Sequence, residues 1–402
     1  MRYYILAFLS ILFFSCQKSE ELKLSKGLYK AVLEGKDKVQ MPFMFEVKND
    51  SLLTIYNAEE KIDVDEITYF KDSVKIQTPV FEAYITAKIT NDTLIGNYFK
   101  PSMNRVVPFK AFKNNFRFEF KNKPTMNITG NWETVFNENN ETERYIAKGI
   151  FKQKGNIVTG TFRTPTGDYR FLEGNIDGDS LKLSTFDGAH TFLFKAKITD
   201  SIMNGLFYSG NHSKEYFTAK FNNNYKLPNS DNTTYIKRGY NSFNFSFTDT
   251  RGRLISSSDP EFDNKITIVQ IMGTWCPNCL DESKYLANYY KKNKRDVAIV
   301  ALAFEIGKTR EKAYKQINRF KDKVKVTYPV LLAQYNNEES KQKASGKLPM
   351  LNGIKSFPTT IFIDKNKKVR KIVTGFNGPA TGEKYEEFKS EFESFVEKLI
   401  QE

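Results

Sequence analysis

Two cysteines, Cys276 and Cys279, lie between an apolar segment and an amphipathic one, and this arrangement strongly restricts how the C-terminal half of the chain can fold. Residues 266–272 are apolar except for Gln270, which is typical of a buried strand. Residues 281–292 carry apolar side chains at helical spacing. The two cysteines are therefore expected at a strand-to-helix junction of an α/β domain.

A Cys-x-x-Cys pair at the start of a helix is suited to thiol chemistry. Backbone N–H groups there stabilise a thiolate and lower the pKa of a cysteine below its free value of about 8.5. The second thiol then lies one turn further in, close enough to form a disulfide. We predict that Cys276 is the exposed thiol that attacks a substrate disulfide and that Cys279 resolves the mixed disulfide. The alternative is a static disulfide or half of a zinc site, but the other candidate ligands are few: Cys16, His190 and His212.

Two signatures in this half resemble the thioredoxin fold. The first is Trp275-Cys276-Pro277-Asn278-Cys279 after a strand, and the second is Phe357-Pro358-Thr359-Thr360-Ile361. On this resemblance Pro358 is cis and faces the disulfide, and the backbone of Phe357 pairs with the substrate chain. Residues 241–402 are most similar to the TlpA/ResA branch of envelope thiol-disulfide oxidoreductases. The resemblance implies a thioredoxin-like domain whose substrate-binding residues are Trp275, Phe357, Pro358 and Thr359.

The same resemblance assigns a role to Glu282. In this branch a glutamate at that position tunes the thiols and moves protons, whereas the alternative is a solvated helix carboxylate. Gln270 occupies the strand position at which thioredoxins carry a buried Asp. Because a neutral amide cannot act as a base, that duty passes to Glu282 or water. The spacing of 82 residues from Cys276 to Pro358 is longer than in a minimal thioredoxin and fits the extra strand and helix of this branch. We expect a helix over 309–321 and a strand over 326–332 within it.

Residues 22–224 consist of short alternating segments broken by Asn, Asp and Gly, which predicts antiparallel β structure. Several of these segments recur about a hundred residues later. The matched pairs are Gly27-Leu28-Tyr29 with Gly130-Asn131-Trp132, Asp72-Ser73-Val74-Lys75 with Asp179-Ser180-Leu181-Lys182, Ala87-Lys88-Ile89-Thr90 with Ala196-Lys197-Ile198-Thr199, and Gly96 with Gly205. We predict an internal duplication, with one copy over 22–120, a second over 125–224 and a linker over 225–240. Each copy is a small sandwich or barrel, or the two pair into a larger one.

The N-terminus has the pattern of a signal peptide that ends at Cys16. Arg2 precedes an apolar run over residues 3–14, and Ser15 stands before the cysteine. A small residue before a cysteine resembles a bacterial lipobox, which implies a lipidated Cys16 and a membrane-anchored protein in an oxidising envelope compartment, facing the periplasm or the cell surface. An uncleaved hydrophobic anchor is the alternative.

The charge and composition indicate which partners and cofactors are not expected. The net charge is +14, but the basic residues are scattered and form no nucleic-acid motif, so no nucleic-acid partner is expected. With only two His, neither a metal nor an organic cofactor is predicted.

We therefore predict an envelope thiol-disulfide oxidoreductase. The family resemblance implies that it acts as a reductase, receives electrons from a membrane thiol reductase and acts on disulfide-bearing envelope proteins, apocytochrome c among them. One alternative is a peroxiredoxin-like peroxidase, although residues 266–273 lack the Pro that this class needs near Thr274. The other is a surface binding lipoprotein in which the β region does the work and the thioredoxin-like domain is accessory.

Overall fold

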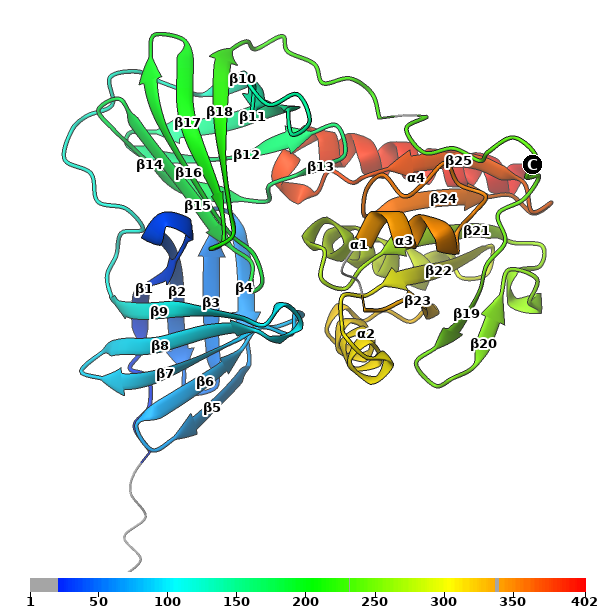
Figure 1. Ribbon diagram of the computed structural model, residues 1–402, viewed down its shortest axis with the longest axis horizontal. Coiled ribbons are helices and arrows are strands. Elements are labelled where there is room, and N and C mark those ends of the chain that lie inside the picture. The colour runs from blue at the N-terminus through cyan, green and yellow to red at the C-terminus, as the bar shows by residue number, and fades with distance from the viewer. Residues whose placement is uncertain (1–20, 231, 337–339) are drawn as a thin grey trace, which may run out of the picture.

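Three β-sheets divide the chain into three consecutive parts (Figure 1). The computed structural model describes residues 21–230, 232–336 and 340–402. The predicted signal peptide and the predicted lipidation of Cys16 lie outside these residues. In the part of the chain that is described, no helix is both long and apolar enough to span a bilayer.

The first sheet is antiparallel and open, with the strand order β4-β3-β2-β1-β9-β8-β7-β6-β5. Two-residue turns join several of its neighbouring strands. Asn91 and Asp92, both with positive φ, link β7 to β8 as hairpin turns require. The inward side chains form a core that includes Tyr29, Phe43 and Phe45. The strands are β1 (Gly27–Glu34), β2 (Gln40–Asn49), β3 (Leu52–Asn57), β4 (Glu60–Val64), β5 (Glu66–Phe70), β6 (Ser73–Gln77), β7 (Tyr84–Thr90), β8 (Thr93–Lys100) and β9 (Arg105–Lys113).

The second sheet is also antiparallel, and it closes into a barrel because β11 pairs with both β10 and β12. Closure leaves few free strand edges. Fully buried aromatic side chains fill the interior, among them Trp132, Phe136, Phe162 and Phe194. The strands are β10 (Gly130–Phe136), β11 (Tyr145–Lys154), β12 (Ile157–Thr164), β13 (Gly167–Asp168), β14 (Leu172–Asp177), β15 (Ser180–Phe186), β16 (Thr191–Thr199), β17 (Ile202–Ser209) and β18 (Ser213–Phe221). Both sheets confirm the predicted antiparallel β region.

The third sheet is mixed and has the order β20-β19-β23-β22-β21-β24-β25, with β21, β22 and β23 parallel. Helices α1 and α4 pack together, since Tyr285 and Tyr289 of α1 both meet Phe392 of α4 edge to face. This confirms the predicted thioredoxin-like α/β fold. Its strands are β19 (Ser246–Asp249), β20 (Leu254–Ser256), β21 (Ile266–Met272), β22 (Val297–Phe304), β23 (Val330–Gln334), β24 (Thr359–Ile363) and β25 (Val369–Thr374), and its helices are α1 (Pro277–Asn293), α2 (Arg310–Val324), α3 (Ser340–Lys347) and α4 (Glu383–Gln401).

Element ends differ from the prediction where proline or capping decides them. Helix α1 begins at Pro277, because proline suits the first helical position and Cys276 caps the helix. Helix α2 begins one residue after Thr309, whose hydroxyl oxygen accepts the N–H of Lys312. Strand β23 begins only after Pro329, which has no N–H to give to a sheet.

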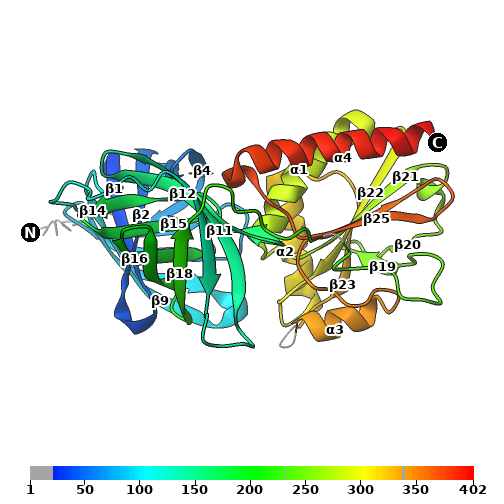
Figure 2. The same ribbon diagram turned by 90° about the horizontal axis from the view of Figure 1, so that it is seen from above.

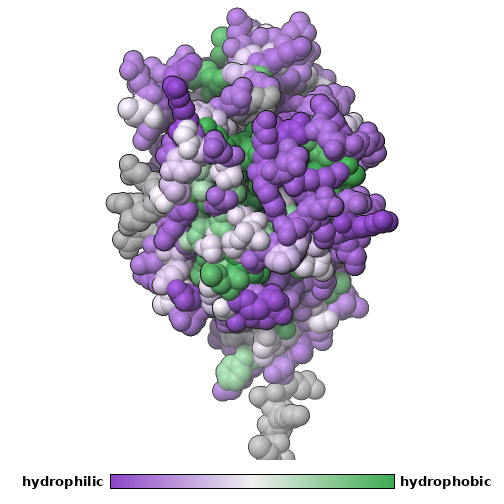
Figure 3. Space-filling view, turned by 90° about the vertical axis from the view of Figure 1, so that its right-hand side faces the viewer, coloured by the Kyte–Doolittle hydropathy of each residue, from purple (hydrophilic) through white to green (hydrophobic). Residues whose placement is uncertain are grey.

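The α/β domain and the β-sheets lie side by side in both ribbon views (Figures 1 and 2). The face of the α/β domain that points away from the sheets is mostly hydrophilic (Figure 3). The predicted linker runs along this domain, because Ile236 bridges to Leu351 and the N–H of Lys237 donates to the Met350 carbonyl at 2.8 Å.

The buried side chain of Arg170 joins the three parts. Its guanidinium donates to Glu60 of β4 in the first sheet and, at 2.7 Å, to Asp281 of α1. Its Nε lies 3.9 Å from Asp187, in the turn that follows β15 of the second sheet. Since all these side chains are largely buried, the charges are stable only when they meet.

We expect Arg170→Met to lower the free energy of unfolding by about 3–5 kcal/mol, because it leaves buried carboxylates without their cation. Urea titration of the variant and the wild-type protein measures this. Arg253→Met is the matched control, since Arg253 pairs with Asp249 while being 59% exposed and should cost no more than about 1 kcal/mol. Equal losses in the two variants would contradict the role given to Arg170.

Candidate active site

Cys276 and Cys279 form a disulfide at the N-terminus of α1, with their Cα atoms 5.2 Å apart. Cys276 is the N-cap residue, and its Sγ accepts the N–H of Cys279 at 3.2 Å. Cys276 is 5% exposed and Cys279 is fully buried. Cys276 is therefore the more accessible sulfur, although much less exposed than the sequence analysis assumed, and the helix N-terminus is placed to stabilise its thiolate.

The second signature lies directly against this disulfide. The Phe357–Pro358 peptide bond is cis, as predicted, and the Phe357 carbonyl oxygen is 3.6 Å from the Sγ of Cys276. The Trp275 ring meets the Phe357 ring edge to face, and its Nε1 donates to the Phe304 carbonyl at 2.9 Å. The side chain of Thr359 is buried and donates to the Ser356 carbonyl at 2.8 Å, so a contact between Thr359 and substrate stays a prediction.

Glu282 lies one turn beyond Cys279 and is buried, which excludes the solvated alternative. Its carboxylate accepts hydrogen bonds from Gln270 Nε2 and Thr360 Oγ1, both at 2.7 Å. Burial raises its pKa to about 7, against the effect of these two hydrogen bonds. A group that titrates near neutral pH is suited to proton transfer.

Thr360 is the residue of this cluster that the sequence analysis missed. Residues i and i+2 of a strand share a face, so a strand that turns Pro358 toward the disulfide turns Thr360 the same way. The alternation of β24 could therefore have found it.

A second buried carboxylate, Glu305, lies on the other side of the cysteines. It follows β22 and accepts hydrogen bonds from the N–H of Thr274 at 2.9 Å and from its hydroxyl at 2.6 Å. Burial raises its pKa to about 7 as well. Glu305 thus holds the turn that carries Trp275; the sequence analysis did not identify it.

The β12–β13 hairpin of the second sheet covers the site from the side of Pro277 and Asn278. The Thr166 carbonyl accepts the N–H of Phe376 at 3.2 Å, and Asp168 accepts the N–H of Gly378 at 2.6 Å. The approach is so close that a Cβ on Gly375, whose φ is +87°, would overlap the backbone of Thr166. Sequence analysis missed this contact because it joins segments about two hundred residues apart.

Over residues 21–230, 232–336 and 340–402, no three His, Cys, Asp or Glu side chains gather as a metal site would require.

Comparisons with known proteins match the α/β part of the chain. The Redoxin family model matches residues 237–387. The thiol-disulfide oxidoreductase ResA of Bacillus subtilis (strain 168) is 32% identical over 141 residues, which are 35% of this chain and 69% of that protein. The chain belongs to the ResA family of thiol-disulfide oxidoreductases.

Other ResA proteins match the same share of the chain. ResA of Geobacillus thermodenitrificans (strain NG80-2) is 27% identical over 142 residues, 35% of this chain and 72% of that protein. A thioredoxin family thiol:disulfide interchange protein of Chlorobium tepidum TLS, known from a crystal structure, aligns with 41% of this chain and 99% of its own at 22% identity and a TM-score of 0.30. The names of the ResA relatives favour this enzyme class over the peroxidase alternative.

We expect Asp168→Ala to loosen the hairpin and speed alkylation of reduced Cys276 by about tenfold at pH 8, since a hydrogen bond to a charged group contributes about 1.5–3 kcal/mol. Iodoacetamide labelling followed by peptide mass spectrometry measures this rate. Asp179→Ala removes an exposed carboxylate that pairs with Lys197 and is the control. An unchanged rate for Asp168→Ala would mean that the hairpin does not limit access.

The raised pKa of Glu282 makes stability depend on pH. Between its ordinary value of 4.5 and about 7 the folded protein holds the proton more tightly than the unfolded chain, so this group lowers stability as pH rises. Glu282→Gln removes the effect, and its unfolding free energy relative to wild type should rise by up to about 3 kcal/mol from pH 5 to pH 8. Urea titrations of the oxidised proteins at both pH values test this, with exposed Glu391→Gln as control. A difference that does not change with pH would refute it.

Proposed function

We propose that the reduced Cys276–Cys279 pair reduces disulfides of envelope proteins by thiol-disulfide exchange. The observation that carries this is the arrangement of the two sulfurs, with Cys276 capping α1 beside the Phe357 carbonyl and Cys279 fully buried behind it. An accessible first thiol and a hidden second one suit attack followed by resolution.

The exchange transfers two electrons. The Cys276 thiolate attacks one sulfur of the substrate disulfide, the other substrate sulfur leaves as a thiolate and takes a proton, and a mixed disulfide forms. Cys279 then loses its proton and attacks Cys276, which releases the second substrate thiol and leaves the enzyme as the disulfide. We assign the proton of Cys279 to Glu282, because that carboxylate is three residues further along α1 and titrates near neutral pH.

Substrate is held, in this proposal, by the backbone of Phe357 at the cis proline, with Trp275, Pro358 and Thr359 completing the contact surface. A main-chain contact of this kind requires no particular substrate sequence. Substrates would be disulfide-bearing envelope proteins, apocytochrome c among them.

The location follows from residues 1–16. We propose that Cys16 is lipidated and anchors the protein to an envelope membrane, on the periplasmic or the cell-surface side, and that a membrane thiol reductase supplies electrons. The support is the signal pattern in the sequence and the likeness to envelope oxidoreductases.

We also propose that the two β-sheets are copies of one unit. In each, the first strand pairs with the second and the last, as β1 does with β2 and β9, and β10 with β11 and β18. Corresponding surface ion pairs support the same register, Asp72 with Lys88 at 3.0 Å and Asp179 with Lys197 at 2.6 Å.

The reduction potential of the cysteine pair tests the proposed function and its direction. We expect about −250 mV or lower for protein lacking residues 1–21, equilibrated in thiol redox buffers. A value near about −120 mV would instead mark a disulfide-forming oxidant. The absence of a reversible two-electron couple would overturn the exchange mechanism and favour the surface binding lipoprotein.

A further inference from the structure

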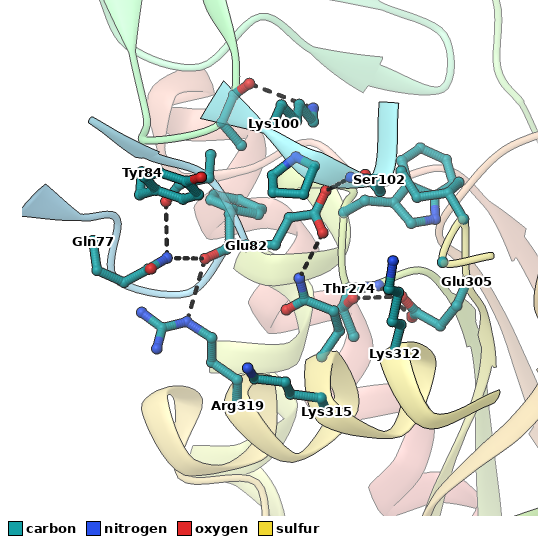
Figure 4. A pocket seen from close by; sticks show the side chains of 18 of the residues that line it. Gln77, Glu82, Tyr84, Lys100, Ser102, Thr274, Glu305, Lys312, Lys315 and Arg319 are labelled. Carbon is teal, nitrogen blue, oxygen red and sulfur yellow. Dashed lines mark hydrogen bonds between the residues drawn. The ribbon is translucent and has the colours of Figure 1, made fainter. Parts of the chain in front are cut away.

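A cavity of about 490 Å³ lies between the first sheet and the α/β domain (Figure 4). Trp275 forms part of its wall. Its other walls come from the β6–β7 loop, from the segment after β8 and from α2. The size suits several side chains of a bound polypeptide. Since Trp275 immediately precedes Cys276, the cavity lies next to the Cys-x-x-Cys motif.

The charged side chains around this cavity do not balance. The cations are Lys75, Lys100, Lys308, Lys312, Lys315 and Arg319, and the anions are Glu66, Glu82 and Glu305.

All three anions already have partners. Glu66 pairs with Arg319 at 3.0 Å, and Glu82 accepts hydrogen bonds from the N–H of Ser102 at 2.6 Å and from Gln316 at 3.2 Å. Glu305 accepts both hydrogen bonds of Thr274. Six cations against three carboxylates leave the lining of the cavity with an excess of positive charge.

Three lysines on the other wall have no such partner. In the described part of the chain, the ammonium groups of Lys308, Lys312 and Lys315 make no hydrogen bond or ion pair, and all three side chains are exposed. Lys312 and Lys315 lie one turn apart on α2, on the face that lines the cavity (Figure 4). They place positive charge along this wall of the cavity.

Deeper in the cavity, two polar groups lack adequate partners. Lys100 is 7% exposed, yet its Nζ makes a single hydrogen bond, to the Ala189 carbonyl at 3.4 Å. The hydroxyl oxygen of Ser102 is buried without a hydrogen-bond partner. Burial lowers the pKa of Lys100, and the nearby carboxylates of Asp187 and Glu82 oppose this only in part. A further carboxylate bound beside Lys100 would stabilise its charge. A buried cation and a free hydroxyl are what an anionic ligand requires.

We propose that this cavity is a substrate-recognition site for acidic polypeptide segments next to the disulfide to be reduced, their carboxylates meeting Lys100, Lys312 and Lys315. The inference rests on the proposed function, because it names the substrate class for the same cysteine pair. Cys276 would take the disulfide while the neighbouring acidic residues lie past Trp275.

Three synthetic peptides with one disulfide each test this, identical except that Glu, Gln or Lys flanks the cysteines. Protein lacking residues 1–21 is reduced with dithiothreitol, freed of it and mixed with each peptide at low salt, and the single-turnover rate constant is measured. We expect the Glu peptide to react about tenfold faster than the Lys peptide, and the ratio to fall toward one at high salt.

The double variant Lys312→Glu/Lys315→Glu should lose or invert this preference. Lys291→Glu/Lys292→Glu is the control, because it makes the same charge change at the exposed end of α1 and should leave the preference unchanged. Equal rates for the three peptides with wild type, or equal effects of the two double variants, would overturn the recognition site while leaving the exchange reaction intact. If wild type reduces none of the peptides, the proposed function itself fails.

Discussion

The buried guanidinium of Arg170 is the interaction on which the arrangement of the chain depends. It takes one carboxylate partner from each of the three parts, from β4, from the turn after β15 and from α1. Removing charges from water is costly, and the cost is offset only while every partner is in place. Such a group adds little net stability but discriminates strongly between arrangements, because any misplaced domain would leave a bare charge inside the protein.

The position of Arg170 and its carboxylates also determines which surfaces surround the two cysteines. Arg170 donates to the Pro277 carbonyl at 3.3 Å, inside the Cys-x-x-Cys motif, and it directly follows the hairpin that covers that side. The cysteines thus lie between a closed wall made by the second sheet and a charged cavity facing the first. Two buried carboxylates flank the motif. Glu305 accepts hydrogen bonds from Thr274 just before it, and Glu282, one turn past Cys279, links α1 to Gln270 of β21 and Thr360 of β24.

Local patterns carried most of what could be predicted about the α/β domain. Strands β21 and β22 and the cis bond before Pro358 follow from apolar runs and a short motif that the sequence displays directly. The burial of Glu282 could not be predicted, since a helix period shows which residues share a face but not what covers it. The ion pairs of Arg170 could not be predicted either. The sequence around a lone arginine in a β region does not indicate which carboxylate, about a hundred residues away, will pair with it.

The contact between Gly375 and Thr166 has a consequence for how this architecture can vary. A Cβ at Gly375 would overlap the backbone of Thr166, so a larger residue after β25 is tolerated only if the hairpin of the second sheet recedes. The surfaces of the β region and the α/β domain are therefore complementary at this contact. A chimaera that joins the β region of one such protein to the redox domain of another would seat correctly only where both halves share this fit.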